Sequence, residues 1–417
     1  MTTTEESTIE SVESFRERAV AWVSENLQRV TPAEAAQLHD YEDEQAVATN
    51  RALMAKLFDA GFSGICFPRE YGGQGLTVEH LRAFTDASLG YGLPFMFHLP
   101  TMTILAPTLL DFATEEQKRR HIPAILRGDE LWVQFLSEPS GGSDLAAVLT
   151  RASRDGDVYV LNGSKIWSSS AYRSDYALCV CRTNWDVPKH RGISVLIVKV
   201  DQPGIQIEQI RQVDGTREFC QEFFDDVPIP VENVIGDEND GWTIATKLLQ
   251  HEKLAVGGGS PYGLVVGGSG GEGADSDRVA RIASAVGRSA DPSARAAVGE
   301  SAVLRIVQRA VVERVAGAIA SGAMPPSAAS ILKLFNATTG VRRAELAAIA
   351  AGPALVAGDR AAGAVGVQFL ARQGAALAGG SNEIQRNIIS ERVLGMPREA
   401  AADRDVPFKD VPRGAQR

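Results

Sequence analysis

The apolar residues of this chain change their spacing twice, and this change limits the folds that the chain can adopt. From about residue 5 to residue 127 they recur three and four positions apart, as on one face of a helix. Between Leu131 and Pro230, runs rich in Val and Ile alternate with Gly, Pro and Asp turns, which is typical of strands; the runs are residues 159–161, 176–181, 193–200 and 205–210. Helical spacing returns after Gly241 and continues to about Leu394. The pattern predicts helices, then a compact β domain, then helices.

Length, charge and cysteine content exclude several classes of protein. A chain of 417 residues exceeds what one hydrophobic core usually organises, so we expect more than one domain. The net charge of -10 disfavours a nucleic-acid partner. The sequence contains no run of 18 or more apolar residues and no secretory signal, so we expect neither a membrane span nor export. Four cysteines and six scattered histidines form neither a disulfide framework nor a metal-ligand cluster. We therefore expect a reduced, metal-free, cytoplasmic protein.

The segment from Gln134 to Asp144 carries the strongest local signal. An apolar strand ends there in Ser-Glu-Pro-Ser-Gly-Gly-Ser-Asp, where Pro139 cannot donate to a strand ladder and Gly142 admits unusual backbone angles. The freed N–H groups and small hydroxyls could lie against a flat polar ligand. Taken alone, the same residues are also typical of an ordinary turn.

Three further motifs accompany this one. They are Gly64-Ile-Cys-Phe-Pro-Arg-Glu-Tyr-Gly-Gly73, Asn162-Gly-Ser-Lys-Ile-Trp-Ser-Ser169 and Gly380-Ser-Asn-Glu-Ile-Gln-Arg-Asn387. In order and spacing, all of them resemble motifs of the acyl-CoA dehydrogenase family, over roughly residues 55 to 398. The resemblance implies an α+β fold with an N-terminal α-helical domain (1–129), a central β-barrel-like domain (130–238), a C-terminal four-helix bundle (239–400) and a tail (401–417).

The resemblance implies FAD as cofactor and an acyl-CoA thioester as substrate, which such enzymes oxidise to the trans-2-enoyl-CoA. The residues matched to flavin-contacting positions are Gln134, Leu136, Ser137, Gly142, Ser143, Trp167, Ser169, Ser381 and Glu383. Those matched to substrate contacts are Ser143, Lys253, Gly379 and Gly380. Lys253 departs from the family pattern, in which an Arg is common at this position.

The family reaction needs a carboxylate to take the α-proton while a hydride leaves Cβ for the flavin. Most members carry a Glu just before the Gly-Thr of the last motif, where this chain has Gly379. The isovaleryl and long-chain types carry it on the helix after the β domain, and Glu252 matches that position. Glu252 also falls on an apolar series with Trp242, Ala245, Leu249 and Val256, which predicts partial desolvation and a raised proton affinity. The alternative is a Glu at the edge of this stripe, paired with Lys247 or Lys253.

The resemblance implies a role for Gly379 even though this residue has no side chain. Ser381 is a good helix N-cap and Glu383 stands in the first turn, so a helix is expected to begin there. In the family, the backbone N–H at the Gly379 position polarises the thioester oxygen, which stabilises an enolate.

Two family features that complete the flavin site are missing. Residues 287–308 lack the Arg-x-x-Phe-Gly motif, and Ala348–Pro353 stands where a Gln-x-x-Gly-Gly loop is expected. Some bacterial members are heterotetramers in which a paralogue supplies these contacts. The expectation is therefore an α2β2 hetero-oligomer with a paralogous subunit, otherwise a homotetramer, reoxidised by an electron-transfer flavoprotein.

Alternatives to this function remain open. The chain could be a catalytically silent subunit that stabilises an active paralogue, or a flavin-dependent oxidase or monooxygenase of the same fold. The heteromeric members often accept bulky or steroid side-chain thioesters, and the small residues Ala378 and Gly379 would leave room for such a group.

A glycine-rich segment also matches a dinucleotide-binding pattern. Residues 268–273 satisfy G-x-G-x-x-G and Asp291 lies near the distance of a ribose-binding acid. No alternating strands and helices surround them, so we interpret the segment as a loop between helices.

Overall fold

The computed structural model describes residues 9–31, 34, 42–256, 260–263, 278–357 and 362–412. The chain folds into two compact units. The first comprises residues 1–210, 217–267 and 402–417, and the second comprises residues 211–216 and 268–401. The glycine-rich segment 268–273 lies outside the described residues.

The first unit begins with a layer of helices. They are α1 (Val12–Asn26), α3 (Glu44–Asp59), α4 (Val78–Ala87), α5 (Phe95–Pro100), α6 (Ala106–Phe112) and α7 (Glu115–Arg127), with a π-helical turn at Thr101–Leu105. Local sequence sets their ends: Thr114 and Gln117 form a capping box at the start of α7, and Gly128 ends it at φ 86°.

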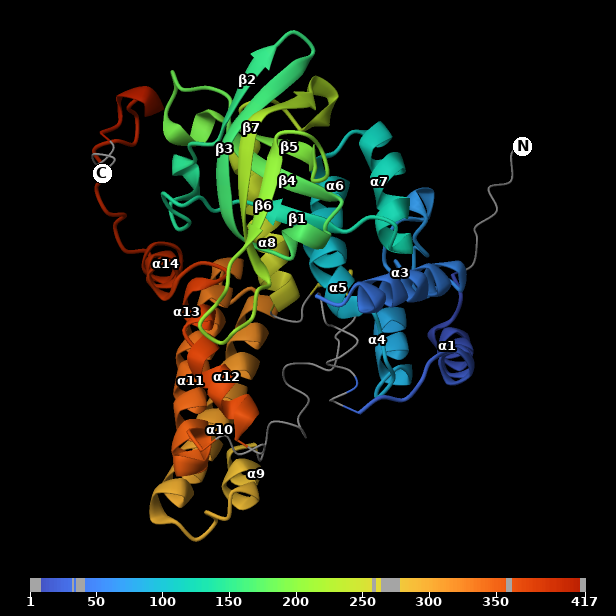
Figure 1. Ribbon diagram of the computed structural model, residues 1–417, viewed down its shortest axis with the longest axis vertical. Helices are drawn as coiled ribbons and strands as arrows, with labels where there is room; N and C mark the ends of the chain where they lie inside the picture. The colour runs from blue at the N-terminus through green and yellow to red at the C-terminus, as the bar shows by residue number, and fades with distance from the viewer. Residues whose placement is uncertain are drawn as a thin grey trace. The chain divides into compact units, whose positions relative to one another are not determined.

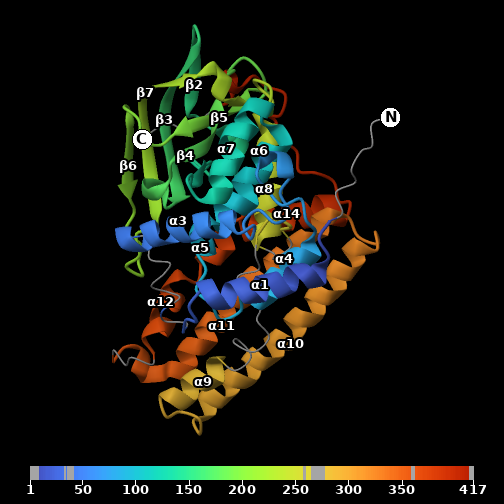
Figure 2. The ribbon, with the colours of Figure 1, turned by 90° about the vertical axis from the view of Figure 1, so that its right-hand side faces the viewer.

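A mixed sheet follows the helices. Its strands are β1 (Trp132–Phe135), β2 (Arg151–Asp155), β3 (Val158–Ser169), β4 (Tyr176–Arg182), β5 (Ile193–Lys199), β6 (Ile205–Gln209), β7 (Phe219–Pro230) and β8 (Val234–Ile235). They run in the order β6-β7-β3-β2-β4-β5-β8, and β1 pairs in parallel with β4. Figure 2 shows α6, α7 and α8 along one side of the sheet, with β6 and β7 at the other side.

Strand β4 is buried on both faces. Because side chains alternate along a strand, its successive residues enter two different cores. Leu178 and Val180 pack in the core shared with the N-terminal helices, whereas Cys179 and Cys181 pack in the core of the β domain. Burial raises the pKa of the Cys179 thiol to about 12. These cysteines are therefore core residues.

Helix α8 (Gly241–Val256) packs in the first unit, where Ile244, Ala245 and Leu248 join the core of the N-terminal helices. It lies against the π-helical turn, α6 and β5 (Figure 1).

The second unit is helical. It contains α9 (Arg278–Ala285), α10 (Pro292–Ala320), α11 (Ala329–Ala351), α12 (Gly363–Ala371), α13 (Gly374–Leu377), α14 (Asn382–Ile388) and a π-helical turn at Ile389–Val393. Helices α10 and α11 lie side by side (Figure 1). Asp291 caps α10 by accepting hydrogen bonds from the amides of Ser293 and Ala294, so its carboxylate already has a structural role.

None of the helices that the structure describes is long and apolar enough to cross a membrane.

Candidate active site

The turn after β1 presents the first group of predicted site residues. Gln134, Leu136 and Ser137 are half-buried, and Gly142 and Ser143 are exposed. Paired backbone hydrogen bonds between Glu138 and Gly141 close the turn, at 3.1 and 2.9 Å. A Cβ at Gly142 would lie 2.9 Å from the Ser137 hydroxyl, so the turn needs glycine to bring these residues together.

A buried ion pair supports this turn. Lys165 Nζ, on β3, lies 2.9 Å from Glu138 Oε1 and donates to the carbonyl oxygen of Leu136 at 3.0 Å. Glu138 also accepts from the amides of Leu149 and Thr150, at 2.6 and 2.9 Å. Burial opposes ionisation of Glu138, but the Lys165 charge and these amides outweigh it and lower the pKa of the carboxyl.

Glu138 and Lys165 were not among the predicted site residues, although they lie within the 134–144 and 162–169 motifs. A Glu at the end of a buried strand and a single Lys in the second motif are a usable signal, because buried charges are almost always paired. The amide of Ile166 also donates to the carbonyl oxygen of Ser137, at 2.9 Å. The two predicted flavin segments are thus joined directly.

The second predicted flavin segment contains a β-bulge that leaves two of its side chains, Trp167 and Ser169, exposed. The pairing of β3 with β7 shifts register between Ile166 and Ser168, and Trp167 adopts a φ of 68°. Trp167 is 55% exposed and Ser169 is exposed, whereas Ser168 between them is buried. The indole meets only the ring of Phe219 edge-on, at 5.9 Å, among the described ring contacts. Strained backbone of this kind is common at functional sites.

On the buried side of the bulge, the Ser168 hydroxyl donates to the Glu222 carboxylate of β7 at 3.0 Å. Glu222 is fully buried, and its Oε1 has no hydrogen-bond partner among the described residues. Burial raises the pKa of the Glu222 carboxyl to about 7. Its side chain faces the interior, so it cannot contact a ligand at the bulge directly.

The buried face of α8 differs from the predicted one. It runs through Ile244, Ala245, Leu248 and His251, and Glu252 is half-buried at its flank. The reason is tertiary: His251 Nε2 lies 2.8 Å from Asp111 of α6, which fixes the rotation of the last turns. Lys253 is exposed, and the Val256 side chain lies outside the described set.

The Gly379–Glu383 turn lies in the second unit. Gly379 and Gly380 have φ values of 64° and 84°, and the Ser381 hydroxyl accepts from the amide of Ile384 at 3.4 Å, which confirms the expected helix start. Glu383 is exposed and lies 3.1 Å from Arg386. The predicted site residues therefore fall into two groups, with Gly379, Gly380, Ser381 and Glu383 in the second unit and the others in the first.

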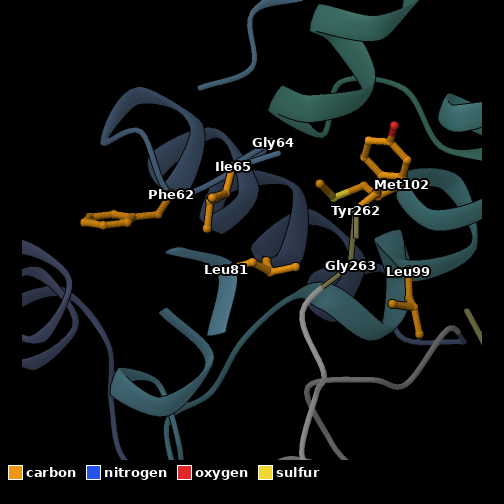
Figure 3. Close-up of a pocket in the computed structure, with 8 residues that line it drawn as sticks. All are labelled: Phe62, Gly64, Ile65, Leu81, Leu99, Met102, Tyr262 and Gly263. Carbon is orange, nitrogen blue, oxygen red and sulfur yellow. The ribbon is translucent and has the colours of Figure 1, made fainter. Parts of the chain in front are cut away.

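An apolar cavity lies within the first unit (Figure 3). It is lined by Phe62, Gly64, Ile65, Leu81, Leu99, Met102, Tyr262 and Gly263. These residues come from the N-terminal helices, the loop after α3 and the segment that follows α8, and the Tyr262 hydroxyl is the one polar side-chain group among them. The described residues contain no group of three or more potential metal ligands.

Comparison with known families supports the motif assignments. Residues 10–129, 134–227 and 239–394 match the N-terminal, middle and C-terminal domain models of acyl-CoA dehydrogenase. Acyl-CoA dehydrogenase IpdE1 of Mycobacterium tuberculosis is 34% identical over 394 residues, covering 94% of this chain and all of that protein. Acyl-CoA dehydrogenase FadE26 of the same organism is 32% identical, covering 88% and 94%.

Solved structures resemble the chain over nearly its whole length. The structure titled Tcur3481-Tcur3483 steroid ACAD has a TM-score of 0.72 at 28% identity, covering 93% of this chain and 98% of that chain. The ChsE4-ChsE5 complex from Mycobacterium tuberculosis has a TM-score of 0.70 at 28% identity, covering 96% and 100%.

Proposed function

The chain belongs to the acyl-CoA dehydrogenase family and is an oxidoreductase of that class, and we propose that it removes the α- and β-hydrogens of an acyl-CoA thioester with Glu252 as the base. The product would be the trans-2-enoyl-CoA. Members of this family depend on a flavin, which in this proposal is FAD.

The residues of the first unit fit a flavin. An exposed indole stands at the bulge of β3, and Ser137 and Gly142 form a close-packed turn that is joined to the same strand. We propose that Trp167 and Ser169 flank the ring system, that Gln134, Leu136, Ser137, Gly142 and Ser143 contact its polar edge, and that Ser381 and Glu383 contribute from the second unit. Bound FAD would supply the acceptor for the β-hydrogen.

The observation that carries the proposed base is the position of Glu252. It is half-buried and follows directly on His251, which the contact with Asp111 holds in place. A partly desolvated carboxylate is suited to taking a proton from a weak carbon acid. Ser143 and the exposed Lys253 are the proposed contacts to the CoA part of the substrate.

The Gly379 turn supplies the complementary electrostatic role. Its positive φ values set the direction of the backbone N–H groups just before the Ser381 cap. We propose that the Gly379 N–H donates to the thioester oxygen, where negative charge develops as the α-proton leaves, while Gly380 allows close approach of the substrate.

The test is anaerobic mixing of the flavin-loaded enzyme with acyl-CoA while the flavin absorbance is followed. Glu252→Gln should slow bleaching by about 10² to 10⁴-fold, the usual contribution of a general base, and leave thioester binding intact. Glu25→Gln, an exposed carboxylate on α1, is the matched control. Normal bleaching by Glu252→Gln would remove Glu252 as the base.

The same experiment separates the alternatives. A wild-type enzyme that holds flavin but never bleaches would be a silent subunit. Rapid return of colour on admitting oxygen would indicate an oxidase or monooxygenase, whereas slow return that electron-transfer flavoprotein accelerates supports the dehydrogenase.

We further propose that the chain works as an α2β2 hetero-oligomer with a paralogous subunit. The Arg-x-x-Phe-Gly and Gln-x-x-Gly-Gly motifs are missing, and the end of α11 is occupied by Arg288, which donates to the carbonyl oxygens of Ile349 and Ala350 at 2.7 and 3.2 Å. Helix α10 also exposes Val303, Ile306 and Val307, with Ile306 at 66%. An apolar face of this kind is typical of a subunit interface. The ChsE4-ChsE5 neighbour is itself titled a complex.

This assembly predicts poor flavin retention by the chain alone and full occupancy when it is co-purified with its paralogue. Ile306→Asp should release the partner, whereas Val20→Asp, which alters an exposed apolar residue of α1, should not. A homo-oligomer with full flavin occupancy would contradict the proposal.

For the substrate class, we propose a bulky, ring-bearing acyl-CoA. The support is the steroid enzyme among the structural neighbours and the absence of a side chain at Gly379, where most family members carry a Glu. Comparison of kcat/KM on straight short-chain and ring-bearing thioesters tests it, and a clear preference for short straight chains would contradict it.

A further inference from the structure

The chain returns to its first unit after completing the second. Residues 402–412, here called the tail segment, pack with the first unit. The amide of Phe408 donates to the carbonyl oxygen of Val187 at 2.9 Å, and that of Lys409 donates to Trp185 at 3.0 Å. The tail segment is therefore held to the loop between β4 and β5 by its backbone as well as its side chains.

Phe408 covers a buried guanidinium. Its ring lies 3.9 Å from Arg182 Cζ, and Phe408 is 2% exposed while Arg182 is fully buried. A cation stacked on an aromatic face and shielded from water is held more strongly than an exposed one. Removing the ring would admit water to this charge.

Arg182 in turn holds the loop that follows the candidate flavin turn. It donates to the carbonyl oxygens of Ala146 at 2.6 Å, Val148 at 3.3 Å and Lys189 at 2.8 Å. Ala146 and Val148 stand three and five positions after Ser143. One guanidinium thus connects the tail segment, the β4–β5 loop and the loop that carries Ser143.

A second connection reaches the same loop. Lys189 Nζ lies 2.7 Å from Asp144 and 3.7 Å from Asp403 of the tail segment. Asp144 directly follows Ser143, so an ammonium shared between the two carboxylates ties the tail segment to the turn.

From these two connections we propose that the tail segment is a positioning element of the active site, with Phe408 and Asp403 fixing the 142–148 loop through Arg182 and Lys189. The proposal rests on the role proposed for Ser143 in binding FAD and CoA. Neither tail residue is assigned contact with substrate or flavin. Their effect is to reduce the freedom of the loop before the ligands arrive, which lowers the entropic cost of binding.

The test combines hydrogen exchange with steady-state kinetics on the full chain. Phe408→Ala should speed amide exchange in residues 142–150 and raise KM for acyl-CoA on the order of tenfold, with kcat changed less, because a displaced contact loop weakens binding. Phe408→Leu should restore part of the protection. Lys409→Ala, also in the tail segment, is the control. It removes only an exposed ion pair with Asp186 of the β4–β5 loop and should leave both readouts within about twofold of wild type.

Asp403→Asn provides a second variant if Phe408→Ala folds poorly. It removes only the charge near Lys189, and exchange should rise at residues 142–145. Unchanged exchange in this loop and unchanged KM in both variants would overturn the proposal, even if thermal stability falls. Faster exchange in an enzyme that fails to bleach would uphold the mechanical link and reject the proposed function, so the two failures are distinguishable.

Discussion

The side-chain amide of Gln385 lies 3.1 Å from the carbonyl oxygen of Gly379 and donates to it. The same Nε2 lies 3.2 Å from the carbonyl oxygen of Gly380, and Gln385 is fully buried. One side chain therefore holds both peptide groups of a turn with two positive φ values. Because a carbonyl and the next N–H belong to one plane, fixing these oxygens fixes the N–H groups of Gly380 and Ser381 and so restrains the backbone of Gly379, whose own N–H is the proposed donor.

Gln385→Leu should lower kcat on the order of tenfold, less than the 10²- to 10³-fold cost of removing an oxyanion donor itself. The shift in the carbonyl vibration of bound thioester should shrink in parallel, a readout that loss of stability alone does not move. Gln373→Leu, at an exposed Gln in the same unit, serves as control. An unchanged carbonyl shift would mean that Gln385 does not orient the donor.

Gly380→Ala tests the backbone of this turn. The residue has a φ of 84°, and an added Cβ would lie 2.7 Å from Gln385 Nε2. We expect a loss of about 1–3 kcal/mol in unfolding free energy from strain. Gly374→Ala, in helix α13 with no atom near the new Cβ, should be neutral or slightly stabilising. Equal effects of the two substitutions in chemical denaturation would contradict the strain argument.

Lys165→Met should be strongly destabilising, because it leaves the Glu138 carboxylate buried without its ammonium partner. We expect a loss of about 3–5 kcal/mol, the usual cost of breaking a buried pair from one side. Weaker flavin binding should accompany it, since Lys165 also holds the Leu136 carbonyl. Lys409→Ala breaks an exposed pair and should cost no more than about 1 kcal/mol. Similar urea midpoints for the two variants would show that the buried pair is unimportant.

Glu222 predicts an unusual pH dependence of stability. Its pKa rises from 4.5 to about 7 on folding, chiefly through burial, so the folded state binds more protons than the unfolded state between these values. Stability from this group should therefore fall as pH rises from about 4.5 to 7, by up to about 3 kcal/mol.

Glu222→Gln, which cannot ionise, should remove this slope and be more stable than wild type at pH 8. The measurement is the free energy of unfolding from urea titrations at pH 5 and pH 8. Lys165 also contributes to the Glu222 environment, so the comparison uses the intact Lys165 background. A wild-type protein whose advantage over Glu222→Gln grows with pH would contradict the assignment.

Local pattern was sufficient for the sequence to predict the order of the domains. The spacing of apolar residues distinguished the helical parts from the β domain, and runs of Val and Ile located β4, β5 and β6 close to their observed bounds. Strand β7 was not predicted, because Glu222, Asp225 and Asp226 interrupt its apolar alternation. A buried Glu appears polar in sequence, and only strand pairing reveals that it faces inward.

The motifs by themselves also predicted the turn after β1 and the helix start at Ser381, since turns and helix starts depend on neighbouring residues. The tertiary structure decided how those residues are supported. Lys165 meets Glu138 because β3 crosses behind the turn after β1, Phe408 meets Arg182 because the chain returns to the β domain, and His251 meets Asp111 because α8 packs on α6. Each contact joins residues far apart in the chain, and its energy depends on burial and distance, which no local pattern encodes.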